Sequence, residues 1–260
     1  MSYCELVDRI KSDPLKYIDE YNLLYLRNYL DGYEYFKYLN AFDEKILGLT
    51  GYGLTFFIQS KVIEIGNEYV KNELESCIER GWNSLIPFIE ADPKKQFDFF
   101  FKCFDEFKTL ALEDYDFTPI VRRFDKYDDE IYKLSLVKIR EINVKTNFLQ
   151  FITYIRGRVG MFIGKYDLKS LKCYISGFIY ASKELGVNDA FANFYEQKFN
   201  SFFKEEVLKN QNINIESEMD YTKIIPLFVT DSKEQIKTYL MYFDKFVELW
   251  NVQNKSKYNF

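Results

Sequence analysis

Apolar residues recur along most of the chain with the three- to four-residue period of an amphipathic α-helix. The clearest apolar stripe contains Phe97, Phe100, Phe101, Phe104 and Phe107, which follow the i, i+3, i+4, i+7 spacing of one helix face. Strand signals are scarce, because two-residue alternation and Asn-Gly turns are nearly absent. The pattern therefore predicts an all-α fold.

Helix start signals accompany two of these periodic segments. Asp13-Pro14 and Asp92-Pro93 each place a capping carboxylate before a proline, which is favoured at the first helical position. The first pair predicts a long helix that begins at Pro14 and continues to about residue 40. Gly32 within it is expected to bend or break the helix, or to cost about 1 kcal/mol relative to alanine if the segment stays helical.

One stretch of the chain occurs twice: residues 85–107 align without a gap on residues 224–246. The identical pairs are Ile86/Ile225, Pro87/Pro226, Asp92/Asp231, Lys94/Lys233, Gln96/Gln235, Phe104/Phe243, Asp105/Asp244 and Phe107/Phe246. A weaker echo aligns Gly53 with Gly177. Such self-similarity predicts an internal duplication.

The duplication suggests two multi-helix halves, arranged as a helical bundle or a short α-solenoid. We expect an N-terminal half at residues 1–112, an acidic connector at 113–130 and a C-terminal half at 131–260. The separations of the two echoes differ, which predicts an inserted polar loop at residues 209–220 of the second half. The repeated residues make and pack helices, so function is expected where the halves differ.

Composition restricts the function further. With 47% hydrophobic residues, 29% charged residues and a net charge of −5, the chain reads as a folded domain rather than a disordered chain or a membrane protein. It contains no apolar run of about 18 residues, and its first residues lack the apolar core of a signal peptide. We therefore expect a cytoplasmic protein.

The chain has no histidine, which excludes imidazole bases and histidine-bearing metal sites and leaves only carboxylate, Lys, Tyr or Cys chemistry. Its four cysteines are dispersed, so free buried thiols are expected rather than a metal site or a disulfide framework. Gly48, Gly51 and Gly53 lack the surroundings of a phosphate loop and predict close helix packing. We expect neither an enzyme nor a cofactor.

The acidic connector is the main candidate site, because its carboxylates alternate with aromatic residues that can anchor a basic protein surface. The alternative interpretation is a solvated loop between two domains. The predicted partner-binding residues are Glu113, Asp114, Tyr115, Asp116, Asp125, Tyr127, Asp128, Asp129 and Glu130. Nucleic acid is not an expected partner, because the chain is acidic and its arginines are dispersed.

Aromatic residues are unusually frequent, with 26 Phe and 22 Tyr. Core packing accounts for most phenylalanines, whereas tyrosine in such excess is typical of interfaces, where an apolar ring carries a polar tip. The sequence thus favours a protein that binds another protein.

Whole-chain character, as in EYNLLYLRNYLDGYEYFKYLN and KYDLKSLKCYISGFIYASKELG, resembles the immunity proteins of bacterial toxin–immunity systems, including contact-dependent growth inhibition and polymorphic toxin systems. The resemblance implies a non-catalytic inhibitor that neutralises a cognate toxin, often a basic nuclease, in bacterial competition. Two alternatives remain. One is a helical scaffold or regulator that binds a small apolar ligand between the halves, and the other is an enzyme that uses Tyr, Lys or Glu.

Overall fold

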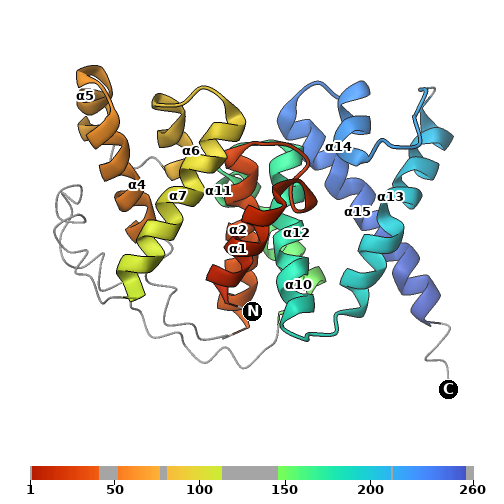
Figure 1. Ribbon diagram of the computed structural model, residues 1–260. Coiled ribbons are helices and arrows are strands. Elements are labelled where there is room, and N and C mark those ends of the chain that lie inside the picture. Colours follow the sequence, from red (N-terminus) through yellow and green to blue (C-terminus); the bar gives the residue numbers. More distant parts are fainter. Residues whose placement is uncertain (1, 41–51, 77–80, 113–145, 212, 256–260) are drawn as a thin grey trace. The chain divides into compact units, whose positions relative to one another are not determined.

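Helices make up every regular element in the part of the chain that the structure describes, which is residues 2–40, 52–76, 81–112, 146–211 and 213–255 of a computed structural model (Figure 1). The predicted all-α fold is confirmed. Neither cis peptide bonds nor β-bridges occur within these ranges.

Contacts divide the chain into two compact units. Unit 1 comprises Met1–Arg27 and Asn40–Asn143, and unit 2 comprises Asn28–Leu39 and Val144–Phe260. Helix α2 (Leu23–Leu39) therefore starts in unit 1 and ends in unit 2. This division differs from the expected halves in two respects, since residues 28–39 group with the C-terminal part of the chain and unit 2 resumes at Val144 rather than at residue 131. The expected connector, 113–130, lies outside the described residues.

Unit 1 is built around the apolar face of its longest helix, α7. Its elements, besides the start of α2, are α1 (Tyr3–Ser12), η1 (Pro14–Lys16), α4 (Tyr52–Ile65), α5 (Glu68–Ser76), α6 (Trp82–Leu85), η2 (Ile86–Phe88) and α7 (Pro93–Leu112). The predicted apolar stripe of α7 is buried at all five phenylalanines. Trp82 of α6 packs on Phe100 with ring centroids 4.3 Å apart, and Phe57 of α4 lies 5.5 Å from Phe107.

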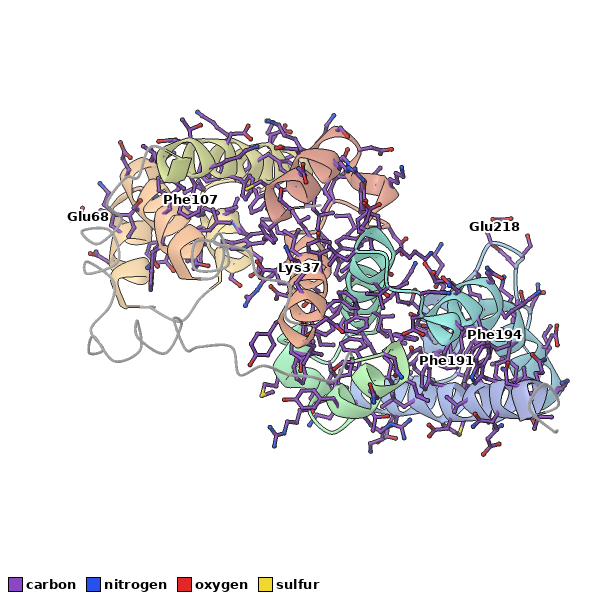
Figure 2. All side chains as sticks on the ribbon, turned by 90° about the horizontal axis from the view of Figure 1, so that it is seen from below. Lys37, Glu68, Phe107, Phe191, Phe194 and Glu218 are labelled. Atoms are coloured by element: carbon purple, nitrogen blue, oxygen red, sulfur yellow. The ribbon has the colours of Figure 1, made fainter. Side chains whose placement is uncertain are left out.

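Unit 2 has a core made largely of aromatic rings. Its elements, besides residues 28–39, are α10 (Phe148–Arg156), α11 (Val159–Ile163), α12 (Leu168–Glu184), α13 (Ala190–Asn210), α14 (Tyr221–Ile224), η3 (Ile225–Leu227) and α15 (Ser232–Lys255). Phe151 stacks on Phe178 with centroids 3.8 Å apart. Phe191 and Phe194 of α13 lie beside α15 (Figure 2), where Phe194 is 4.8 Å from Phe246.

The segment after Asp13 corrects the predicted start of the long helix. Pro14 opens only the short turn η1, the Asp13 side chain makes no capping hydrogen bond, and α2 begins at Leu23. Asn22 supplies the missing start signal, because its side-chain oxygen accepts from the Leu24 amide at 3.0 Å. A proline fixes one backbone angle and suits a helix start without ensuring propagation.

Both copies of the repeated stretch adopt the same local structure: a short α-helix, a 3₁₀ turn carrying the proline, and a long α-helix. Asp92 accepts from the Lys95 amide at 2.9 Å, and Asp231 accepts from the Glu234 amide at 3.0 Å. The side chain of Gln96 donates to the Glu90 carbonyl at 2.8 Å, and Gln235 donates in the same way to Val229 at 2.8 Å. These repeated residues form local framework, whereas the duplication of complete halves stays a prediction.

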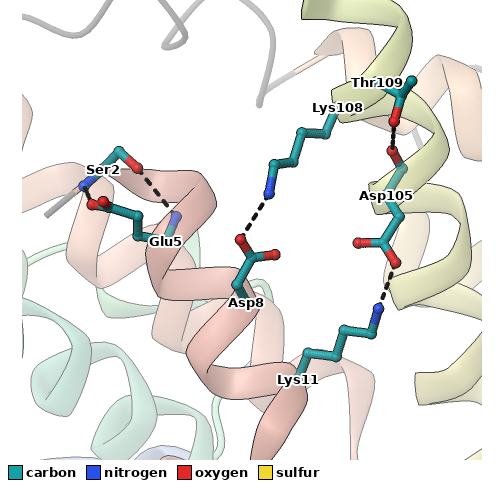
Figure 3. Close-up of polar contacts among 7 residues, drawn as sticks. All are labelled: Ser2, Glu5, Asp8, Lys11, Asp105, Lys108 and Thr109. Carbon is teal, nitrogen blue, oxygen red and sulfur yellow. Dashed lines mark hydrogen bonds and ion pairs between the residues drawn. The ribbon is translucent and has the colours of Figure 1, made fainter.

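Helices α1 and α10 each begin with a reciprocal cap. Ser2 accepts from the Glu5 amide at 3.1 Å while Glu5 accepts from the Ser2 amide at 2.7 Å (Figure 3). Asn147 and Gln150 make the same pair of bonds at 2.9 and 3.0 Å. Each reciprocal cap satisfies two backbone N–H groups that the helix itself leaves unpaired.

Ion pairs join α1 to α7 in unit 1 and α10 to α15 in unit 2. In unit 1, Lys11 of α1 donates to Asp105 of α7 at 2.5 Å (Figure 3). In unit 2, Arg156 of α10 pairs with Asp244 of α15. Asp105 and Asp244 are identical partners in the sequence repeat, so the two units share a contact between segments far apart in the chain.

Two glycines allow α2 and α12 to cross at backbone contact within unit 2. A Cβ atom on Gly32 would lie 2.0 Å from the Tyr174 carbonyl oxygen, and one on Gly177 would lie 1.9 Å from the Tyr29 carbonyl oxygen. Helix α2 continues without a break through Gly32. The absence of a side chain at this position is what lets the two helix backbones approach each other. Gly177 thus has a packing role at the α2–α12 crossing, while its sequence alignment with Gly53 stays a prediction.

Candidate functional site

The predicted partner-binding residues, Glu113 to Glu130, all lie outside the described residues. The candidate site is therefore built from other residues. The expected inserted loop, 209–220, is described except at position 212. It is tied to its own unit, because Lys204 donates to the Ser217 carbonyl and the loop ends at Asp220, which caps α14.

Asp220 has a structural role at the end of this loop. Its carboxylate accepts from the Lys172 ammonium at 2.7 Å and from the Thr222 hydroxyl at 2.6 Å. Burial opposes ionisation of Asp220, but the bonds from Lys172 and Thr222 outweigh it and hold the pKa of the carboxyl below its ordinary value. The carboxylate is thus fully engaged within the protein.

Unit 2 exposes a group of aromatic side chains that three elements bring together. We call it the tyrosine patch and define it as Tyr35 and Tyr38 of α2, Tyr154 of α10, and Met161 and Phe162 of α11. Tyr38, Tyr154 and Met161 have exposed fractions of 50%, 58% and 64%. Large side chains grouped in this way mark interaction surfaces more often than isolated exposed ones do.

Tyr35 lies at the centre of the tyrosine patch. Its ring stacks on those of Tyr38 and Tyr154, with centroids 6.3 and 6.1 Å away, and meets Phe162 edge-on at 5.5 Å. Burial raises the pKa of the Tyr35 hydroxyl well above its ordinary value, and the hydrogen bond with Tyr154 adds to the effect. Tyr35 is therefore a neutral anchor that holds its exposed neighbours.

Buried residues fix the tyrosine patch from below. Tyr35 also lies 6.0 Å from Phe151 and 6.2 Å from Tyr174, both of which are in the core. Side chains held in this way lose little conformational freedom when a partner binds, and tyrosines are favoured at such positions because a rigid ring carries a hydroxyl. The patch is thus a preformed surface suited to binding another protein.

Charges of both signs lie near the tyrosine patch: Asp31 and Glu34 are one turn from Tyr35 and Tyr38 on α2. Arg158 and Lys165 flank α11, are exposed, and have no ion-pair partner in the described ranges.

Sequence reasoning missed the tyrosine patch. Tyr35 appeared in the sequence as one of many apolar positions of a helix, and Tyr154 and Phe162 lie far from it along the chain. The excess of tyrosine was the available signal, but it does not say which tyrosines come together. Only the packing of α2 against α10 and α11 assembles them.

The described residues contain no group of three or more His, Cys, Asp or Glu side chains placed to hold a metal ion. In the same ranges, no helix combines the length and apolarity needed to cross a bilayer. Comparison with models of protein families, with curated proteins and with solved structures finds no match for this chain.

Proposed function

We propose that the chain is a non-catalytic, protein-binding inhibitor that acts in the cytoplasm, of the immunity-protein kind that its sequence resembles. The observation that carries the proposal is the tyrosine patch: exposed aromatic rings, stacked on one another and anchored on the core. Residues that dominate protein–protein affinity are enriched in Tyr and Trp and lie in desolvated, well-packed centres. The patch supplies such a centre.

The acidic connector is the second part of the proposal. A toxin with a basic surface, such as a nuclease, would be attracted by the carboxylates of residues 113–130, while the tyrosines would provide short-range contacts. Charge complementarity mainly sets association rates, and aromatic contacts mainly set dissociation rates. The two surfaces therefore predict separable kinetic effects.

The first test is growth rescue. The protein encoded by the adjacent upstream reading frame would be expressed in a bacterial host with and without this chain. We expect the upstream protein alone to arrest growth and co-expression to restore it. Growth arrest that this chain does not relieve, or an upstream protein without toxicity, would argue against an immunity function.

The second test measures binding between the purified pair. Tyr38→Ala and Tyr154→Ala are each expected to weaken the complex about 10- to 30-fold, chiefly through faster dissociation. Tyr69→Ala is the matched control, because Tyr69 lies on α5 in unit 1 with an exposed fraction of 66%. Equal effects of all three substitutions would remove the patch from the interface.

Charge reversal of the connector separates the acidic part of the proposal from the aromatic part. Replacing Asp114, Asp116, Asp128 and Asp129 by lysine should slow association about tenfold at low salt and reduce its dependence on ionic strength. Unchanged association kinetics would identify residues 113–130 as a linker only.

A further inference from the structure

Unit 1 contains a pocket of about 470 Å³ between the end of α1, the segment around Tyr21 and one face of α7. Its floor is aromatic: Phe97 and Phe101 are buried, and Tyr21 meets the Phe97 ring edge-on with centroids 5.3 Å apart. The pocket is open to solvent on one side and has the size of a small-molecule site. Of these three rings, only Tyr21 is half-buried rather than buried, so it is the one that an apolar group in the pocket would contact.

Three charged side chains on α7 line this pocket. Lys94, Asp98 and Lys102 follow one another at four-residue intervals and therefore lie on the same helix face. Not one of them has an ion-pair partner within 4 Å in the described part of the chain, and all three are exposed. The pocket thus presents both cations and a carboxylate that the protein does not itself neutralise.

The remaining two charges at the pocket neutralise each other. Lys11 and Asp105 form one of the ion pairs between α1 and α7, at 2.5 Å. This pair holds the two helices together at the rim and leaves recognition to the other charges.

The corresponding place in unit 2 is arranged differently. Tyr166 corresponds to Tyr21, because it lies the same number of residues after Tyr21 as Arg156 lies after Lys11. Lys233 is the repeat partner of Lys94. There the Lys233 ammonium lies 5.1 Å from the Tyr166 ring centre, so the tyrosine and lysine satisfy each other.

The next charged position differs as well. The counterpart of Asp98 is Lys237, which pairs with Glu234 at 2.5 Å. The counterpart of Lys102 is Met241. Of the three charges of the unit 1 pocket, only Lys94 thus has a like-charged counterpart, and that counterpart contacts a tyrosine ring.

We propose that the unit 1 pocket binds a small zwitterion with an apolar body, of the size of an aromatic amino acid or dipeptide. Asp98 holds the ammonium, the lysine on one side of it, Lys94 or Lys102, holds the carboxylate, and the half-buried Tyr21 receives the ring. Charge-assisted hydrogen bonds then hold both ends of the ligand along the face of α7. This proposal does not rest on the proposed inhibitor function.

Calorimetric titration of the full chain with three related probes tests the zwitterion requirement. Glycyl-phenylalanine carries both charges, 3-phenylpropionate lacks the ammonium, and 2-phenylethylamine lacks the carboxylate. We expect saturable binding of the dipeptide, with each singly charged probe at least about tenfold weaker. Absence of saturation by the dipeptide at about 10 mM, or equal binding of all three probes, would overturn the proposal.

Substitutions then assign the charges. The double variant Lys94→Ala, Lys102→Ala should weaken dipeptide binding at least about tenfold, and Asp98→Asn should weaken the dipeptide about threefold or more without weakening 3-phenylpropionate binding. Lys233→Ala and Lys237→Ala at the corresponding place in unit 2 are the matched controls and should change nothing. Because Asp98→Asn also removes a charge that repels an anion, 3-phenylpropionate should bind this variant at least as tightly as it binds the parent. If the unit 2 controls weaken dipeptide binding as much as the unit 1 variants do, the pocket is not the site.

Discussion

Gly32 packs directly against the backbone carbonyl of Tyr174, so closely that a Cβ atom would lie 2.0 Å from its oxygen. Gly32→Ala and Gly177→Ala are each expected to lower the free energy of unfolding by about 2–4 kcal/mol, because the obstructing atoms are backbone and cannot rotate away. Urea denaturation followed by circular dichroism measures this. Gly157→Ala is the control, because nothing lies within 4 Å of its added Cβ, and it should stay within about 0.5 kcal/mol of the parent.

The Tyr195 and Tyr239 hydroxyls share a buried hydrogen bond of 2.9 Å. Replacing either residue by phenylalanine leaves the other hydroxyl without this bond and should cost about 1–2 kcal/mol, whereas the double variant should cost less than the sum. A double-mutant cycle from urea denaturation checks this. Additive costs would mean that the hydrogen bond contributes nothing.

Alkaline pH should destabilise unit 2 through the same tyrosines. Burial raises the pKa of both Tyr195 and Tyr239 well above the ordinary value of 10.0. A raised folded-state pKa contributes stability that is complete below the unfolded-state pKa and is lost as pH rises through the folded-state pKa. Stability should therefore fall above about pH 10, and tyrosinate absorbance should develop together with unfolding. Tyrosinate formation by all tyrosines in a still-folded protein would contradict this.

Asp220 both caps α14 and pairs with Lys172, so Asp220→Ala should cost about 2–3 kcal/mol at neutral pH. Asp220→Asn keeps a capping oxygen and should cost less. Because the folded-state pKa lies below the ordinary 3.8, the contribution of the charge is present above that value and is lost as pH falls through the folded-state pKa. Urea denaturation at pH 7 and at about pH 3 should show the gap between parent and Asp220→Asn narrowing in acid.

Cys103 should resist thiol reagents while the protein is folded. It is buried, and burial, followed by the nearby Glu106 carboxylate, raises the pKa of its thiol to about 12. Since the thiolate is the reactive form, Cys103 should remain unmodified at pH 8 under conditions that label the more accessible Cys4. Peptide mapping after alkylation measures both sites, and equal labelling of the two would show that unit 1 opens readily.

The sequence predicted the parts of the fold that local periodicity and capping control. The apolar stripe of α7 and the caps at Asp92 and Asp231 follow from short-range spacing, and all are present in the structure. The start of α2 was missed because Asp13-Pro14 favours a helix start without supplying the following turns. A side-chain cap at Asn22 was the weaker signal and the one that the structure uses.

The sequence predicted the kind of residue that forms the candidate site, but not which residues come together there. An excess of tyrosine pointed to an interface, but Tyr35, Tyr154 and Phe162 become neighbours only through packing of distant helices. The pocket on α7 was equally hidden, because Lys94 appeared in the sequence as a repeated framework position. Lys94 and Lys233 differ in what their ammonium groups contact: Lys233 lies over the Tyr166 ring, whereas Lys94 lines the pocket. This difference appears only in the three-dimensional structure.

Helix α2 crosses the boundary between the units, and this affects the order in which the chain can fold during synthesis. Residues 28–39 leave the ribosome long before Val144. Their aromatic side chains therefore cannot pack into the core of unit 2 until its C-terminal helices have been synthesised. Phe36, for example, finds Phe178 only when α12 has emerged. A protease that cuts between residues 113 and 145 should therefore leave the N-terminal fragment held to the C-terminal one by α2, and the two should separate only in denaturant.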